Sequence, residues 1–289
     1  MYLQCATRRL PLDQPAVMGV INVTPDSFSD GGCYATPESA LQRAQTMVEE
    51  GAAIIDIGGV STRPGAAPVS TEEELSRVLP VVEQVAARLP VIVSVDTSNP
   101  QVMRRAADSG AHMINDVRAL RLEDALEAVA PTGLAVCLMH MQGEPPTMQR
   151  NPSYVDVVAE VHDYLEARIG ACFSAGIAAD RLCIDPGFGF GKLLRHNIEL
   201  LHRLSDLARL GPPLLVGLSR KSMAGALSGG QAGASQATAN ARPAPERLAA
   251  SLALATIAVL NGASIVRAHD VAATLDAVRV AATFLEDRH

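Results

Sequence analysis

Three clusters of cationic and hydroxyl side chains follow short apolar runs in this sequence. They are Ser61-Thr62-Arg63-Pro64-Gly65 after AAIIDIGG, Ser219-Arg220-Lys221-Ser222 after PLLVGL, and Arg267-Ala268-His269 after ASIV. Guanidinium groups with neighbouring hydroxyls bind phosphate and carboxylate groups well, because they offer charged donors in fixed directions. If the apolar runs are strands that end at one place, the three clusters converge there. The spacing therefore predicts an anionic substrate.

Carboxylate and amide side chains end a second set of apolar runs. Asp96 ends VIVSVD, Asn115 lies in HMINDV, and Asp185 follows RLCI. Such groups can bind the donor and acceptor edge of a heterocycle, and a buried carboxylate can stabilise developing positive charge. Asp56 lies inside a run, ahead of Gly58-Gly59, so a structural role in the barrel is open for it.

Asn22 is followed by the sequence VTPDSFSDGG and offers a neutral oxygen of the kind that binds magnesium.

Aromatic residues make up only 3% of the chain, so Phe28, Phe188 and Phe190 are candidates for the wall of an aryl pocket. The histidines lack zinc-site spacing, and no GxGxxG, Walker A or GxSxG motif is present. These absences argue against a zinc enzyme, a dinucleotide oxidoreductase, a P-loop enzyme and a hydrolase.

The apolar runs number eight, and most are separated by stretches with helical periodicity. This alternation predicts a single (β/α)8 TIM barrel, whose active site lies at the C-terminal strand ends. We expect strands at 17–22, 53–58, 181–185, 214–217 and 264–267, and others ending at Asp96, near Val117 and near His140. We expect helices to start at Pro37, Thr71 and Asn99-Pro100, and to cover 154–175 and 271–286.

The predicted domain organisation has one barrel with short extensions. Residues 1–14 form an N-terminal segment, 15–280 form the barrel, and 281–289 form the C-terminal tail of the last helix. The stretch 229–245 (GGQAGASQATANARPAP) is small and polar without periodicity, which predicts a flexible insertion.

Bulk properties exclude several classes of protein. The net charge of −7 argues against nucleic-acid binding, and no apolar run is long enough to span a membrane. The N-terminus lacks the apolar core of a signal peptide. The five cysteines are scattered without a CxxC pair, which predicts free thiols in a cytoplasmic protein.

Taken together, the motifs resemble those of the dihydropteroate synthases of bacterial folate synthesis. The matching stretches cover nearly the whole chain: MGVINVTPDSFSDGG (18–32), STRPGA (61–66), VSVDTS (93–98), INDV (114–117), CLMHMQGEPPTMQ (137–149), IDPGFGFGK (184–192), VGLSRKS (216–222) and VRAHDV (266–271). The resemblance implies an enzyme that joins 4-aminobenzoate to 6-hydroxymethyl-7,8-dihydropterin diphosphate, giving 7,8-dihydropteroate and pyrophosphate. It also implies Mg²⁺ as cofactor, sulfonamides as inhibitors and a homodimer in the cytoplasm.

The resemblance also implies a role for each site residue. Asn22 would ligate magnesium and, with Arg267 and His269, hold the diphosphate. The pterin edge would be read by Asp96, Asn115, Asp185 and Lys221, and the arylamine site would be shaped by Thr62, Arg63, Phe190, Lys221 and Ser222. The chemistry itself would depend on Asp96, Asp185, Lys221 and Arg63.

One position departs from the family pattern Gly-Gly-Glu-Ser-Thr-Arg-Pro-Gly. Val60 stands where the family has glutamate. We expect the fold and pterin binding to tolerate this change, and any penalty to fall on the arylamine step. Two alternatives are a pterin-binding paralogue that is weak or silent in catalysis and a pterin-dependent methyltransferase domain. The methyltransferase would not need the STRPG and SRKS clusters together.

Overall fold

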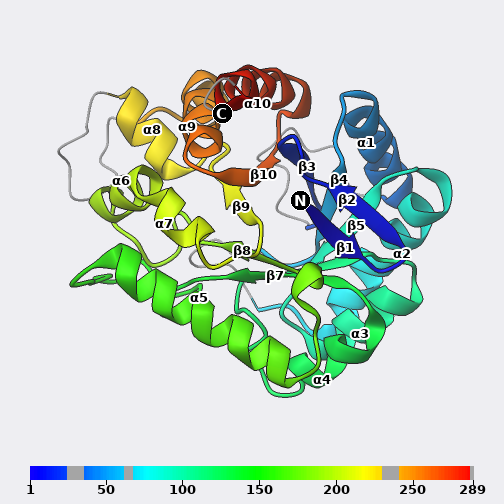
Figure 1. Ribbon diagram of the computed structural model, residues 1–289. Coiled ribbons are helices and arrows are strands. Elements are labelled where there is room, and N and C mark those ends of the chain that lie inside the picture. The colour runs from blue at the N-terminus through cyan, green and yellow to red at the C-terminus, as the bar shows by residue number, and fades with distance from the viewer. Residues whose placement is uncertain (25–35, 62–67, 230–240, 287–289) are drawn as a thin grey trace.

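Eight parallel strands close into a barrel, and helices surround it (Figure 1). The computed structural model describes residues 1–24, 36–61, 68–229 and 241–286. Around the barrel the strands follow the order β10-β3-β4-β5-β6-β7-β8-β9. Their bounds are β3 (Ala16–Asn22), β4 (Ile54–Gly58), β5 (Ile92–Asp96), β6 (Met113–Asp116), β7 (Ala135–Met139), β8 (Leu182–Asp185), β9 (Leu214–Gly217) and β10 (Ala263–Ala268). The predicted (β/α)8 barrel is confirmed.

The register of the strands brings several polar residues to one level. Asn22 is paired with Gly58, Gly58 with Asp96, and Asp96 with Asn115. Because all these strands are parallel, their C-terminal ends meet at the same mouth of the barrel. The register therefore determines which side chains share the mouth.

The helices begin largely where the sequence predicts. The side chains of Thr36, Ser70 and Asn99 accept hydrogen bonds from backbone N–H groups in the first turns of α1, α2 and α3, at 3.2, 3.2 and 2.9 Å. The helices are α1 (Pro37–Glu49), α2 (Thr71–Arg88), α3 (Pro100–Asp108), α4 (Ala125–Val129), α5 (Val157–Ser174), α6 (Leu194–His202), α7 (Leu204–Ala208), α8 (Ser222–Ser228), α9 (Leu248–Leu260) and α10 (Val271–Glu286).

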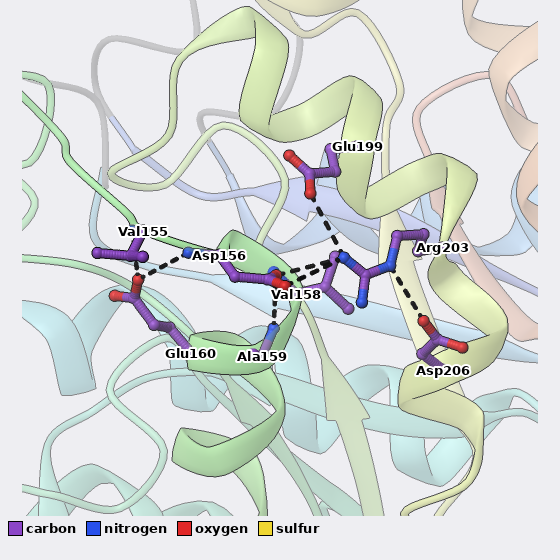
Figure 2. A network of polar contacts seen from close by, with 8 residues as sticks. All are labelled: Val155, Asp156, Val158, Ala159, Glu160, Glu199, Arg203 and Asp206. Atoms are coloured by element: carbon purple, nitrogen blue, oxygen red, sulfur yellow. Dashed lines mark hydrogen bonds and ion pairs between the residues drawn. The ribbon is translucent and has the colours of Figure 1, made fainter.

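Helix α5 starts three residues later than the predicted Tyr154. The Asp156 carboxylate accepts from the N–H groups of Val158 and Ala159 at 2.9 and 3.0 Å, so it caps the helix (Figure 2). Arg203 then joins this cap to α6 and α7 through contacts with three carboxylates, those of Asp156, Glu199 and Asp206. The cap decides the start because it satisfies N–H groups that have no partner within the helix.

The N-terminal segment folds as a hairpin against the barrel. β1 (Tyr2–Cys5) pairs antiparallel with β2 (Arg8–Pro11), and Figure 1 shows both in front of the barrel strands. Leu3 and Leu10 of the hairpin pack against Ile54, Ile92 and other residues at the N-terminal strand ends. The hairpin thus covers the end of the barrel opposite the mouth.

Most of the predicted insertion at 229–245 lies outside the described residues. Its first residue, Gly229, ends helix α8, and its last residues enter a short 3-10 turn at Ala244–Arg247 that leads into α9. The chain before this turn is attached to α8, because the N–H of Arg242 donates to the carbonyl of Gly225 at 3.2 Å.

Candidate active site

Asp56 is the centre of the polar network at the barrel mouth. Its carboxylate is fully buried and accepts from Ser94 Oγ at 2.7 Å, from Asn115 Nδ2 at 3.0 Å and from Arg267 Nε at 2.6 Å. The role that the sequence leaves open for Asp56 is therefore a structural one, since it orients other side chains. It fixes the Asn115 amide with its NH₂ group toward Asp56, which turns the amide oxygen the other way.

Asp96 lies beside this network at the end of β5. Its Oδ2 accepts from Arg267 Nη2 at 2.9 Å, so one guanidinium joins Asp56 and Asp96. Burial raises the pKa of Asp96 to about 7, against the opposing effect of the Arg267 charge. In such buried surroundings, a carboxylate and a positive charge that develops near it stabilise each other strongly.

Asp185 and Lys221 form the opposite side of the mouth. Asp185 is buried at the end of β8 and accepts from the N–H of Gly187 at 2.7 Å. Burial raises the pKa of Asp185, and the nearby Lys221 charge opposes the rise. For Lys221 burial lowers the pKa to about 8, and the Asp185 carboxylate opposes that fall. The two groups thus perturb each other across the mouth, as functional groups in clefts commonly do.

The Lys221 ammonium also contacts the loop that follows β8. Nζ donates a hydrogen bond to the carbonyl oxygen of Phe188 and lies 4.6 Å from the centroid of the Phe190 ring. Phe188 is buried, whereas Phe190 is half-buried. Of the two candidate wall residues, Phe190 therefore faces the mouth and Phe188 belongs to the core.

The cluster Ser219-Arg220-Lys221-Ser222 does not act as one anion site. Arg220 forms a two-point ion pair with Asp270, at 2.6 and 3.0 Å, and its backbone is left-handed with a φ of 57°. Its N–H donates to Ser251 Oγ at 2.9 Å, which holds this conformation. Lys221 does not share this pairing: its ammonium donates to the carbonyl of Phe188, and its charge interacts with that of Asp185. Ser222 is exposed and opens helix α8.

His269 follows β10 and lies next to the end of β9. Its Nδ1 is 3.0 Å from Ser219 Oγ, and its backbone N–H donates to the same oxygen at 3.3 Å. Its carbonyl accepts from Arg43 Nη2 at 2.9 Å. His269 is therefore held by the turn after β9 and by helix α1, and Arg267 lies two residues before it, near the end of β10.

Asn22 ends β3 close to Asp96. The oxygens Asn22 Oδ1 and Asp96 Oδ2 lie 3.6 and 3.8 Å from the point where a Cβ atom on Gly58 would stand. Two oxygen atoms that could ligate a metal therefore approach one point at the mouth.

A search of the described residues for three or more His, Cys, Asp or Glu side chains spaced to hold a metal ion finds one group, His162, Asp163 and Glu166. These residues lie on the outer helix α5, away from the strand ends.

Thr62, Arg63 and Phe28 lie outside the described residues. The residues just before the loop that carries Thr62 and Arg63, its stem, are described and contact α2. The carbonyl of Gly59 in this stem accepts from Arg77 Nη1 at 2.9 Å. Buried Glu74 lies beside this stem and accepts from Thr97 Oγ1 at 2.5 Å. Val60 is half-buried between the stem and the loop.

Two residues of the mouth receive no role from the sequence. Lys192 and His140 are buried, and Lys192 Nζ lies 2.8 Å from His140 Nδ1. Both follow apolar runs, as the assigned residues do, but nothing local separates a buried lysine from one that faces the substrate. Their pairing depends on the meeting of β7 and the loop after β8.

Comparison with known proteins places the chain in one family. The family model described as pterin binding enzyme matches residues 18–269. The dihydropteroate synthase of Escherichia coli K12 is 55% identical over 271 residues, covering 94% of this chain and 92% of the relative. A crystal structure of the Yersinia pestis dihydropteroate synthase with a sulfonamide drug complex superposes with a TM-score of 0.92 at 50% identity, covering 99% and 100% of the two chains. The Xanthomonas albilineans enzyme in complex with 7,8-dihydropteroate gives a TM-score of 0.83 at 44% identity, covering 98% of each.

Proposed function

Because this chain belongs to the dihydropteroate synthase family of pterin-binding enzymes, we propose that it makes 7,8-dihydropteroate from 6-hydroxymethyl-7,8-dihydropterin diphosphate and 4-aminobenzoate. In this reaction the bond between the pterin methylene carbon and the diphosphate oxygen breaks. The arylamine nitrogen bonds to that carbon, pyrophosphate leaves, and one N–H proton is lost. The observation that carries the proposal is the meeting of Asp96, Asn115, Asp185 and Lys221 at one barrel mouth.

One edge of the pterin consists of ring nitrogens and an amino group. To bind this edge, the protein must offer both hydrogen-bond donors and hydrogen-bond acceptors. Asp96 and Asp185 supply acceptors, and Asn115 supplies an amide whose direction Asp56 fixes. Lys221 supplies a donor on the side of Asp185. Asp96, Asn115 and Asp185 come from three different strands, and Lys221 comes from the turn between β9 and α8, so the barrel itself holds the groups in place. Such preorganised groups bind most effectively.

The same carboxylates act on the chemical step. As the C–O bond breaks, the pterin methylene becomes electron-poor and the positive charge spreads into the ring. Asp96 and Asp185 lie in low-dielectric surroundings, where their stabilisation of this charge is stronger than in water. The arylamine is a neutral nucleophile, so water or the departing pyrophosphate can take its proton.

Arg267, His269 and Asn22 are proposed to hold the diphosphate. Arg267 stays cationic, since the charges of Asp56 and Asp96 outweigh burial and raise its pKa. His269 is held in place by Ser219. The loop residues Thr62 and Arg63, with Phe190, Lys221 and Ser222, are proposed to bind the arylamine, on the basis of the family motif.

The residues at the mouth fit a magnesium ion bound mostly through the substrate. Magnesium keeps several waters and binds substrate phosphates together with one or two protein oxygens. Asn22 Oδ1 at the end of β3 supplies such an oxygen next to Asp96. When bound there, the ion would neutralise charge on the leaving pyrophosphate.

One assay tests the proposed reaction. Purified protein is mixed with the dihydropterin diphosphate, 4-aminobenzoate and Mg²⁺, and 7,8-dihydropteroate and pyrophosphate are measured. We expect both products in equal amounts. Pterin binding without product would instead indicate the silent paralogue, and methyl transfer from a reduced folate would indicate the methyltransferase.

We also propose that the protein is a homodimer formed through helices α9 and α10. Ile257 on α9 and Val280 and Phe284 on α10 are 43, 59 and 63% exposed, and the two helices pack against each other. Exposed apolar side chains grouped in this way are typical of protein interfaces. Light scattering during size exclusion should give twice the mass of 30.3 kDa, and Phe284→Glu should shift the protein toward the monomer.

A cytoplasmic location is the last part of the proposal. The described cysteines, Cys5, Cys137, Cys172 and Cys183, are buried free thiols, as expected in a reducing compartment. No helix among the described residues is long and apolar enough to cross a bilayer. Cell fractionation with antibody detection tests the location.

A further inference from the structure

The chain contains only two lysines, and both lie at the barrel mouth. All its other cationic side chains, 22 in number, are arginines. Lys221 is half-buried and contacts the Phe190 ring, whereas Lys192 is buried, with 3% of its surface exposed. A buried lysine is costly unless its ammonium finds several partners. The presence of a lysine at position 192, in a chain that otherwise uses arginine, therefore needs an explanation from its local surroundings.

Lys192 has four acceptors around its Nζ atom. They are His140 Nδ1 at 2.8 Å, Gly187 O at 3.0 Å, Phe190 O at 3.1 Å and His140 O at 3.4 Å. Burial and the Lys192 charge lower the pKa of His140 to about 2, so this imidazole is neutral and its Nδ1 can accept. The amine thus joins the end of β7 to both ends of the segment Gly187–Phe190.

The loop after β8 lies directly on the chain after β7. Gly187 has a φ of 69°, and a Cβ atom there would stand 1.9 Å from the carbonyl oxygen of His140. Gly191 has a φ of 61°, and its Cβ would stand 2.3 Å from the carbonyl oxygen of Gln142. The two glycines permit this close approach, but a glycine-rich segment has no stiffness of its own. Its shape depends on the bonds that hold it.

The segment that Lys192 holds presents two groups to Lys221. These are the Phe188 carbonyl, which accepts from Lys221 Nζ, and the Phe190 ring, 4.6 Å from the same atom. We propose that Lys192 is a positioning residue for the arylamine step: by binding His140, Gly187 and Phe190 it sets the loop that places the Phe190 ring and the Lys221 ammonium. This inference rests on the proposed function for its kinetic test, but its structural part can be tested without substrate.

Lysine suits this position because its head is compact and carries three donors. The planar guanidinium of arginine is larger and directs its donors in a fork, which does not match acceptors grouped around one point. An apolar side chain would take the lysine donor away from all four acceptors; Gly187 O would still accept from the N–H of Phe190, so the loss would fall on the two His140 acceptors and Phe190 O. The pterin groups Asp96 and Asn115 are held by Asp56 and Arg267 instead, so Lys192 should matter less for pterin binding.

The kinetic test uses Lys192→Met, which removes all donors, and Lys192→Gln, which keeps two N–H groups on a shorter stem. For Lys192→Met we expect the Michaelis constant for 4-aminobenzoate to rise about tenfold or more, with pterin diphosphate affinity changed by less than about threefold. Lys192→Gln should lie between wild type and Lys192→Met, and is available if Lys192→Met does not fold. Tyr154→Phe is the matched control: it removes a 2.8 Å hydrogen bond to Gly191, outside the segment Gly187–Phe190.

A double-mutant cycle separates positioning from general loss of stability. In a Phe190→Ala background the effect of Lys192→Met on the arylamine Michaelis constant should shrink below about twofold, because its target is already gone. Equal effects in both backgrounds would overturn the inference. So would folded Lys192 variants with unchanged arylamine constants.

The small number of lysines permits a test without substrate. Protein labelled with ¹³Cε-lysine should give two side-chain signals, and Lys192→Met should leave only that of Lys221. We expect the titration midpoint of the remaining signal to differ from its wild-type value, and to stay unchanged in Tyr154→Phe. An unchanged midpoint in Lys192→Met would overturn the link between the lysines. An inactive wild type would overturn the proposed reaction while this measurement still decides the link.

Discussion

Arg267 Nε lies 2.6 Å from the fully buried Oδ2 of Asp56, although 211 positions separate the two residues in the sequence. The pair closes the barrel between β10 and β4, across the intervening strand β3. Through Nη2 the same guanidinium donates to Asp96 Oδ2 at 2.9 Å. The pair thus connects the closure of the barrel to the geometry of the mouth.

Asp56→Asn tests this connection. Breaking a buried ion pair leaves one charge uncompensated, so we expect the free energy of unfolding to fall by about 3 kcal/mol. Urea denaturation followed by circular dichroism measures it. Asp270→Asn is the matched control, because it breaks the partly exposed pair with Arg220 and should cost about 1 kcal/mol. Equal losses for the two variants would contradict the central role of Asp56.

Asp96→Asn and Lys221→Ala should each lower turnover by about a hundredfold or more, the usual scale for losing one preorganised charged group. Both side chains lie at the mouth, where the pterin methylene would become electron-poor. Steady-state rates with both substrates saturating measure the effect. Rates within about threefold of wild type for either variant would contradict its assigned role.

The pH profile of kcat/KM should have two limbs. Asp96 acts as an anion, and its pKa is raised to about 7, so activity should fall as the pH drops below that value. Lys221 acts as a cation, and its pKa is lowered to about 8, so activity should also fall as the pH rises above that value. The optimum should therefore lie between the two. A flat profile from pH 6 to 9 would show that neither group titrates in the free enzyme.

Asn22→Ala should raise the magnesium concentration needed for half-maximal activity. Asn22 Oδ1 is a neutral oxygen at the end of β3, close to Asp96, and its loss would leave the ion with fewer protein ligands. Activity is titrated with Mg²⁺ at a fixed pterin diphosphate concentration. The idea fails if wild type keeps full activity in excess chelator.

Val60→Glu restores the family residue at the stem of the loop that carries Thr62 and Arg63. Val60 is half-buried next to Gly59, whose carbonyl is held by Arg77. A glutamate there could pair with an arginine or accept from loop amides, so we expect a lower Michaelis constant for 4-aminobenzoate or a higher turnover. Pterin affinity should change little, because its groups come from other strands. If both arylamine parameters stay the same, the valine is neutral.

Local patterns along the chain suffice to predict the order of the elements and the end of the barrel at which the site lies. Alternating apolar runs and helical stretches predict the barrel, and the polar residues at the ends of the runs, such as Asp96 and Asp185, lie at the mouth. The helix starts that follow Ser70 and Asn99 can also be predicted from the sequence, because a capping side chain accepts from N–H groups only two or three residues away. These features depend on neighbours in the chain, so local patterns suffice.

Which polar residues contact one another could not be predicted before the barrel was seen closed. The sequence groups Arg220 with Lys221, but Arg220 forms an ion pair with Asp270, whereas Lys221 donates to the carbonyl of Phe188. The sequence leaves the role of Asp56 open and assigns none to Lys192, because the partners of each come from strands or loops far along the chain. Such pairings form only when the barrel closes and burial removes water, since a buried charge must then take whichever partner the strand register brings to it.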